Sequence, residues 1–143
     1  MTHVTFYEKP GCGGNAKQKA LLAAAGHTLE VRNLLRWAWT PKALFAFLEP
    51  LPVSEWFNRA APAVKSGRLI PELLTAHDAL ARLLAEPLLI RRPLMEADGA
   101  RMVGFDIDRV HAWIGLDAQT TAGISGPMEG CAAAMDGCAA TAA

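Results

Sequence analysis

The chain has 143 residues, of which 52% are apolar, as expected for one domain with a substantial core. Basic and acidic residues number 14 each, so nothing favours nucleic acid or an anionic membrane surface as an obligatory partner. The start of the chain lacks the features of a secretory signal, and no apolar run reaches the roughly 18 residues of a membrane span. We therefore expect a cytoplasmic protein, in a compartment where thiols are kept reduced.

The first residues predict a strand, a helix and a second strand. Residues 4–7 are β-branched or aromatic and lead into a Lys-Pro-Gly loop. Residues 15–25 are strong helix formers, and Gly26 follows as a C-cap. Residues 28–33 form the second strand. Because the crossover is helical, we expect the two strands to be parallel.

The middle of the chain is predicted to be helical. A helix over residues 41–48 is capped by Thr40, a short one follows at 52–57, and a longer amphipathic helix spans 71–85. A buried strand is predicted at 88–90.

The sheet is then expected to continue as a hairpin, because Asp98-Gly99 is a strong turn signal between residues 92–96 and 101–103. A helix over residues 106–114, capped by Asp106, closes the domain. The order β-α-β, helical insertion, β-β-α predicts an α/β protein of thioredoxin-like fold with a mixed central sheet.

The domain is expected to cover residues 1–116. Residues 117–143 are rich in alanine and glycine, and we interpret them as a flexible tail. Truncation after Leu116 should then change stability by no more than about 0.5 kcal/mol.

Three cysteines, Cys12, Cys131 and Cys138, do not form an even set of disulfides and are interpreted as free thiols. The four histidines lack metal-ligand spacing, and the tail cysteines fit a low-complexity segment better than a soft-metal site. Neither a metal nor a bound cofactor is expected.

Cys12 is the predicted chemical centre. It follows the first strand and precedes a helix, whose N-terminal amides stabilise a thiolate. The alternative is a structural cysteine in a glycine-rich turn. A dithiol oxidoreductase would carry its second cysteine at Asn15, which could instead cap the helix. A redox cycle would therefore use an external thiol or a tail cysteine.

Two arginines are candidates for binding an oxyanion or a thiolate. Arg92 directly precedes Pro93, a proline that is usually cis and faces the cysteine in the thioredoxin arrangement, and Arg59 lies in W-F-N-R-A-A-P. Each is alternatively a solvated surface arginine.

Three blocks of the chain, FYEKPGCGGNAKQKALLAAAGH, EWFNRAAPAVKSG and PLLIRRPLMEADGARMVGFD, carry a family resemblance. In this order they resemble the glutaredoxin-coupled arsenate reductase family, which includes the Spx-type regulators, and more narrowly its nitrogenase-associated branch. The resemblance spans residues 4 to about 116 and implies an oxidoreductase connected with nitrogen fixation.

In this family a cysteine attacks arsenate and three arginines hold the oxyanion. The resemblance implies Cys12 as nucleophile and Arg59 and Arg92 as two of the arginines, with glutathione or glutaredoxin as external reductant. The third arginine would fall near Gly104, where there is none, so arsenate reduction should be weak or absent. Gly104→Arg should raise it, provided that the glycine is not needed for a positive φ angle.

A second hypothesis is a non-enzymatic adaptor that binds a protein partner, as the Spx-type regulators bind RNA polymerase. Trp37 and Trp39 would suit such an interface if exposed, since tryptophan is enriched at binding hot spots. Alternatively, they pack the helical insertion onto the core.

Overall fold

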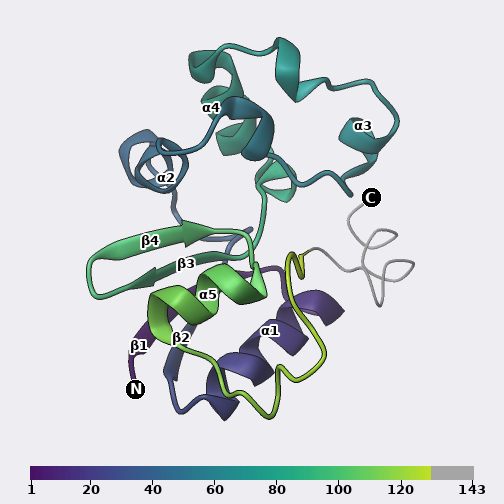
Figure 1. The fold of residues 1–143 in the computed structure, drawn as a ribbon. Coiled ribbons are helices and arrows are strands. Elements are labelled where there is room, and N and C mark those ends of the chain that lie inside the picture. The colour runs from purple at the N-terminus through teal and green to yellow at the C-terminus, as the bar shows by residue number, and fades with distance from the viewer. Residues whose placement is uncertain (130–143) are drawn as a thin grey trace.

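The computed structural model describes residues 1–129, and its centre is a four-stranded mixed sheet (Figure 1). The strands are β1 (His3–Glu8), β2 (Thr28–Asn33), β3 (Leu94–Ala97) and β4 (Ala100–Val103), in the order β2-β1-β3-β4. β1 is parallel to β2 and antiparallel to β3, and β3 is antiparallel to β4. The predicted mixed sheet is confirmed.

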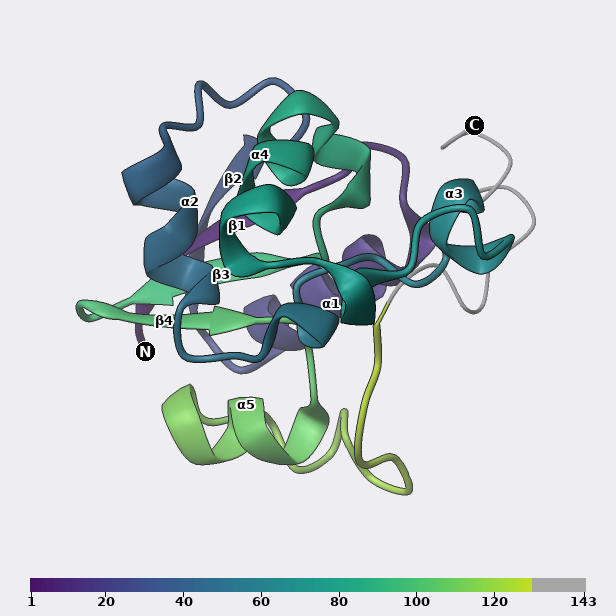
Figure 2. The ribbon, with the colours of Figure 1, turned by 90° about the horizontal axis from the view of Figure 1, so that it is seen from above.

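Helices cover both faces of this sheet. α1 (Gly13–Ala24) and α5 (Ile107–Ile114) lie on one face, and the insertion lies on the other, with α2 (Pro41–Leu48), α3 (Pro62–Lys65) and α4 (Ala76–Ala85) (Figures 1 and 2). Three short 3₁₀ helices, η1 (Val53–Glu55), η2 (Pro71–Leu73) and η3 (Pro87–Leu89), belong to the insertion. Within residues 1–129 no helix is both long and apolar enough to cross a membrane.

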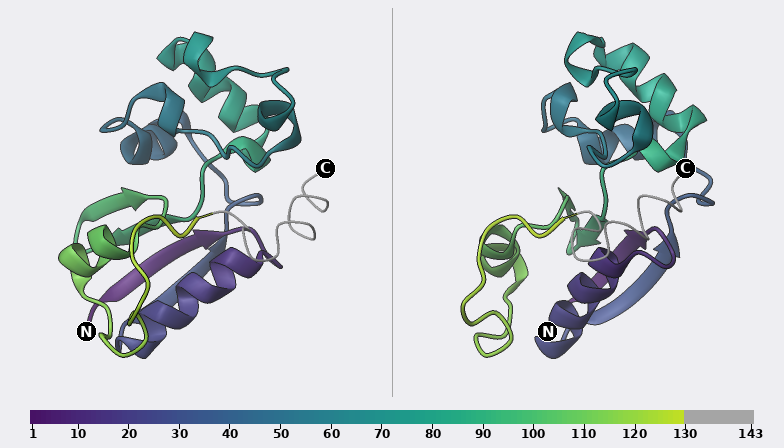
Figure 3. Two further views of the ribbon diagram at one scale, coloured as in Figure 1. Left: turned by 45° about the vertical axis from the view of Figure 1, so that its right-hand side comes forward. Right: turned by 90° about the vertical axis from the view of Figure 1, so that its right-hand side faces the viewer.

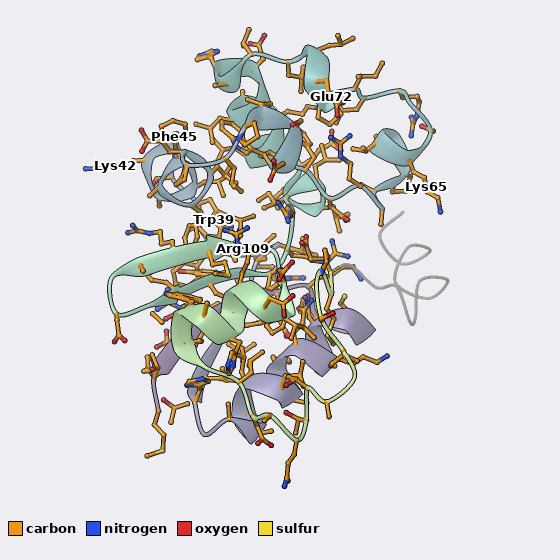
Figure 4. The ribbon with its side chains drawn as sticks, in the orientation of Figure 1. Trp39, Lys42, Phe45, Lys65, Glu72 and Arg109 are labelled. Carbon is orange, nitrogen blue, oxygen red and sulfur yellow. The ribbon has the colours of Figure 1, made fainter. Side chains whose placement is uncertain are left out.

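The two faces of the sheet bury two separate cores because side chains alternate along each strand. On β1, Phe6 packs with the cluster under α1 and α5, whereas Tyr7 packs with the cluster under the insertion. Trp39 lies in the seam between sheet and insertion (Figure 4). Its indole N–H donates to the Leu34 carbonyl at 3.0 Å, and its ring centroid lies 4.8 Å from that of Tyr7. Trp39 therefore joins the insertion to the core.

Several predicted elements are confirmed. The β1-α1-β2 unit is parallel, Thr40 caps α2 through the Ala43 N–H, and Asp106 caps α5 through the Arg109 N–H. The β3-β4 turn has positive φ at both Asp98 and Gly99, as a type I′ turn requires. α1 begins two residues earlier than predicted, at Gly13.

The insertion differs from the prediction in four places, one of which is α3, a short helix that was not predicted. The helix expected over residues 71–85 is split, because the Thr75 hydroxyl accepts the Asp78 N–H at 3.1 Å and starts α4 at Ala76. Residues 52–57 contain only the three-residue η1. The strand expected at 88–90 is wrong: Pro87 starts η3 there, and Ile90 makes an isolated bridge to Phe57.

The residues after Leu116 also differ from the expected tail. They turn back and run up beside α5 and α1 (Figures 1 and 3), and residues 126–129, which we name the strap, are hydrogen-bonded to the domain. The Met128 N–H donates to the Phe105 carbonyl at 2.7 Å, and the Ile107 N–H donates to the Gly126 carbonyl at 2.8 Å. For residues 130–143, which lie outside the described residues, the flexible tail stays a prediction.

Candidate functional site

Cys12 lies where the loop after β1 enters α1. It is the N-cap residue of α1, with extended φ and ψ, and its carbonyl accepts the Ala16 N–H at 3.0 Å. Its own N–H donates to the Lys9 carbonyl at 3.1 Å, and Gly11 closes this turn with φ of 82°. The predicted position at a helix N-terminus is confirmed, and the side chain is only 3% exposed.

In the structure Cys12 is disulfide-bonded, so the expectation of a free thiol is wrong for this residue. An odd number of cysteines leaves one over but still allows one pair, which the count alone did not exclude. Cys131 and Cys138 lie outside the described residues.

A buried hydrogen-bond network fixes the Cys12 loop on α1. The Lys9 N–H donates to Asn15 Oδ1 at 3.0 Å, Asn15 Nδ2 donates to Gln18 Oε1 at 2.8 Å, and Gln18 Nε2 donates to the Met128 carbonyl at 2.5 Å. Asn15 and Gln18 are fully buried. Asn15 is therefore not the helix cap: it binds the backbone of the loop.

The Arg92–Pro93 peptide bond is cis, as the thioredoxin arrangement led us to expect. Tyr7 pairs with Leu94, so this bond lies across from the end of β1, where the Cys12 loop begins. Arg92 is 3% exposed, and burial lowers the pKa of its guanidinium. The alternative of a solvated arginine is therefore wrong for Arg92.

Lys9 is a site residue that the sequence reasoning missed. It is buried, and its pKa is lowered by burial and then by repulsion from the Arg92 charge. The two cations therefore act on one region, beside the turn that ends at Cys12. The available signal was a lysine directly between the first strand and the Pro-Gly-Cys turn.

Arg59 lies in the insertion and is half-exposed. Its Nη2 is 2.6 Å from Glu72 Oε2 and donates to the Ser54 carbonyl at 2.6 Å. The Arg59 hydrogen bonds hold the pKa of the Glu72 carboxyl below its usual value. Glu72 belongs to the far side of the insertion from the sheet (Figure 4), so Arg59 is engaged there in an ion pair.

Gly104, the expected place of a third arginine, has φ of 79°, and its N–H donates to the Pro93 carbonyl at 2.8 Å. A Cβ here would lie 2.7 Å from both Arg91 Nη2 and Glu129 Cδ. Gly104→Arg was expected to raise arsenate reduction only if position 104 did not need a positive φ angle, and this condition is not met. The glycine is needed for its φ angle, and an ion pair fills the adjoining space.

Within residues 1–129, no group of three or more histidine, cysteine, aspartate or glutamate side chains is placed to hold a metal ion. The described site consists of a cysteine, two buried cations and a cis proline. Such a set suits nucleophilic attack by sulfur on an electrophile that carries negative charge.

No family model matches the chain. It is 47% identical over 119 residues, or 83% of each chain, to the "Uncharacterized 15.7 kDa protein in draG 3′ region" of Rhodospirillum rubrum. It is 27% identical over 95 residues to the arsenate reductase ArsI2 of a Synechocystis strain, which covers 64% of this chain and 67% of that one.

Solved structures agree. An ArsC family related protein from Bacteroides fragilis superposes with a TM-score of 0.68 and 25% identity, over 76% of this chain and 95% of that chain. An arsenate reductase related protein from Brucella melitensis gives a TM-score of 0.61 and 26% identity, over 78% and 93%. With its cysteine at the start of α1, the chain belongs to the arsenate reductase (ArsC) family of thioredoxin-like proteins.

Proposed function

We propose that this protein is a thiol-dependent oxidoreductase of the cytoplasm in which Cys12 is the nucleophile. The observation that carries the proposal is the position of Cys12 at the N-terminus of α1, in the loop that leaves β1 across from the start of β3 and the cis Arg92–Pro93 bond. Two buried cations, Lys9 of that loop and Arg92, accompany it. Helix amides and cations both stabilise a thiolate relative to a thiol. The working form is the one in which an external thiol has opened the Cys12 disulfide.

In the proposed cycle the Cys12 thiolate attacks a disulfide sulfur or an oxyanion. With a disulfide, the new S–S bond forms as the old one breaks, and the leaving thiolate takes the electron pair. Glutathione or glutaredoxin then attacks the mixed disulfide and releases Cys12 as a thiolate. With arsenate, Cys12 would bond to arsenic as a hydroxide leaves, and thiol attack on the Cys12 sulfur would pass two electrons to arsenic. Arg92 would neutralise charge on the oxygens.

Arsenate itself is proposed to be a poor substrate. Arg59 already binds Glu72, and position 104 is glycine, which leaves Arg92 with Lys9 to meet a doubly charged ion. A missing charge-assisted donor costs about 1.5–3 kcal/mol, or roughly 10- to 100-fold in affinity or rate. Disulfide exchange does not need a set of cationic donors around the substrate, so a glutathione mixed disulfide should be turned over better than arsenate.

A coupled assay with the reduced full chain, glutathione and glutaredoxin tests this. Cys12→Ser should reduce turnover of both substrates to the rate that glutathione and glutaredoxin give without this protein, and Arg92→Met should slow arsenate turnover about tenfold or more. Arg68→Met, at an exposed arginine of the insertion, is the matched control. Turnover by Cys12→Ser above that background rate would refute the proposal. Robust arsenate turnover that Arg59→Met abolishes would refute only the argument about substrate.

The connection with nitrogen fixation is part of the proposal and rests on one relative. That protein's name places it in the draG 3′ region, and draG belongs to nitrogenase regulation. If the connection holds, the abundance of this protein should rise in native cells that fix nitrogen compared with cells given ammonium. Equal abundance under both conditions would count against it.

A protein-binding adaptor is the second candidate. Trp37 is 40% exposed beside the edge strand β2, with the Arg32 guanidinium 4.2 Å from its ring centroid. The exposed Val31 lies on the same strand. Trp39, by contrast, is partly buried and packs against the core. An adaptor would not need an activated cysteine, so a Cys12 pKa near 8.5 would favour this candidate.

A further inference from the structure

Arg91 makes a two-point ion pair with Glu129, the last residue of the strap. Its Nε donates to Glu129 Oε1 and its Nη2 donates to Oε2, both at 2.6 Å. Its Nη1 donates to the Glu55 carbonyl at 3.2 Å. The bond to Glu129 raises the pKa of Arg91. This forked geometry is the one by which arginine recognises carboxylates and phosphates.

The pair lies beside the Cys12 site. Arg91 directly precedes Arg92 and cis-Pro93, and it lies against Gly104, whose N–H binds the Pro93 carbonyl. From the other side, Met128 of the strap accepts the hydrogen bond of Gln18, at the end of the network that begins at the Cys12 loop. The Arg91–Glu129 pair is thus connected to the Cys12 site on both sides, through the chain at Arg92 and Pro93 and through the strap at Gln18.

The strap has contacts with the domain that do not involve the Glu129 side chain. The backbone of the strap is fixed independently through Gly126 and Met128, which bind Ile107, Phe105 and Gln18. The Arg91 and Glu129 side chains are 20% and 23% exposed, so solvent reaches the pair. A ligand could therefore displace this carboxylate without unfolding the strap.

We propose that the Arg91 guanidinium is an oxyanion-binding subsite of the Cys12 site and that Glu129 occupies it as an internal carboxylate. Its ligand is the negatively charged oxygen group of the molecule that Cys12 attacks, either a free tetrahedral oxyanion or a carboxylate of a thiol peptide. The subsite deepens the proposed function and rests on it for its role, but binding there can be measured without any reaction at Cys12.

The test is a titration of the reduced full chain with inorganic phosphate, followed by the backbone amide NMR signals of Gly104 and Arg91. Dithiothreitol and Tris chloride serve as reductant and buffer because neither brings an oxyanion. Glu129→Gln removes the internal competitor, so phosphate should bind about tenfold tighter than to the unmodified protein. Adding Arg91→Met to that variant should abolish the gain.

Glu55→Gln is the matched control. Its carboxylate is 3.7 Å from Arg91 Nη1 but outside the fork that holds Glu129, so its loss changes the local charge without emptying the subsite. Phosphate affinity should change less than about threefold. An equal gain in both variants would show a general charge effect and overturn the subsite. An unchanged phosphate affinity in Glu129→Gln, with the Met128 amide signal in place, would exclude a free oxyanion as the ligand of the subsite.

A second ligand distinguishes a free oxyanion from the carboxylate of a thiol peptide. S-methylglutathione carries the carboxylates of a thiol peptide but cannot react with Cys12. Binding of this ligand alone assigns the subsite to the thiol peptide, binding of phosphate alone assigns it to a free oxyanion, and binding of neither by Glu129→Gln overturns the proposal. Alkylation of Cys12 in the same samples is an independent readout: a reactive Cys12 without anion binding would leave the proposed function standing and refute only the subsite.

Discussion

Lys9 is the residue whose effect on Cys12 is simplest to isolate. It is buried in the turn that ends at Cys12, and its ammonium and the Arg92 guanidinium repel one another. A cation beside a thiolate lowers the thiol pKa, so its removal should raise that pKa. At neutral pH a smaller fraction of Cys12 would then be thiolate.

We predict that Lys9→Met raises the Cys12 pKa by about one unit, and that Lys9→Arg restores it. Lys17→Met is the control, because Lys17 is an exposed lysine of α1. The measurement is the pH dependence of alkylation of the reduced protein. Equal values for Lys9→Met and the unmodified chain would show that Lys9 does not act on the thiol.

Gly104 supports a prediction on stability. An alanine there suffers both a positive φ, which costs about 1–2 kcal/mol, and a Cβ that meets the Arg91–Glu129 pair at 2.7 Å. Gly99→Ala is the matched control, because Gly99 also has a positive φ but has nothing within 4 Å of its Cβ position.

In denaturant unfolding, Gly104→Ala should destabilise the protein by about 1 kcal/mol more than Gly99→Ala. Gly104→Arg should be at least as destabilising and should not increase arsenate turnover. Equal losses for the two alanine variants would mean that the ion pair moves aside without cost.

At the residue scale, sequence reasoning selected Cys12 and Arg92 as candidates, did not select Lys9, and gave Arg91 no role of its own. The first two follow from local signals, a cysteine before a helix and an arginine before a proline in a recognised fold. The role of Arg91 depends on Glu129, 38 residues away, which no local pattern connects with it. For Arg59, the pairing with Glu72 is likewise a contact between separate elements of the insertion.

Among the elements, the strap is the largest departure from the sequence-based prediction. The composition of residues 117–143 predicted a tail, but Met128 packs beside the core under α1 and α5, and its carbonyl satisfies the fully buried Gln18. The sequence signal for the strap is weak, because four residues with a single large apolar side chain are too few to show a helix or strand periodicity. Backbone hydrogen bonds, the packing of Met128 and the Arg91–Glu129 ion pair hold these residues, and composition encodes none of these contacts.

Two truncations, compared under reducing conditions, test the strap. Truncation after Glu129 should leave the free energy of unfolding within about 0.5 kcal/mol. Truncation after Leu116 should cost about 2–4 kcal/mol, because Gln18 loses a buried partner and Met128 loses its burial. Equal stability of the two truncated chains would show that residues 117–129 contribute nothing to the stability of the domain.

In the helical insertion the prediction failed where short-range signals compete. The leucines of residues 71–85 share one helical period, but Thr75 caps a new helix inside it. An apolar run at 88–90 fits a buried strand and a buried 3₁₀ turn equally well. The turn forms here because Pro87, whose φ is fixed near the helical value, occupies its first position. By contrast, the Asp-Gly turn and the β1-α1-β2 crossover have few alternatives, and both were predicted correctly.

For the whole molecule, the antiparallel pairing places the end of β1 beside the start of β3, so the Cys12 loop and cis-Pro93 lie at the same edge of the sheet. The insertion covers the opposite face from α1, joined to the sheet through Trp39 (Figure 4). This arrangement was predictable because the order of elements and the family resemblance agree. The relation of insertion to site, which decides what Arg59 binds, depends on packing between elements and was not predictable.

The Cys12 pKa tests the central claim most directly. In the reduced full chain, the rate of iodoacetamide alkylation is followed against pH by mass spectrometry of the Cys12 peptide, with Cys131 and Cys138 as references in the same sample. We predict a Cys12 pKa well below the usual value of about 8.5, and faster alkylation at neutral pH than at either reference. A Cys12 pKa near 8.5, with a rate no faster than the references, would contradict the proposed nucleophile.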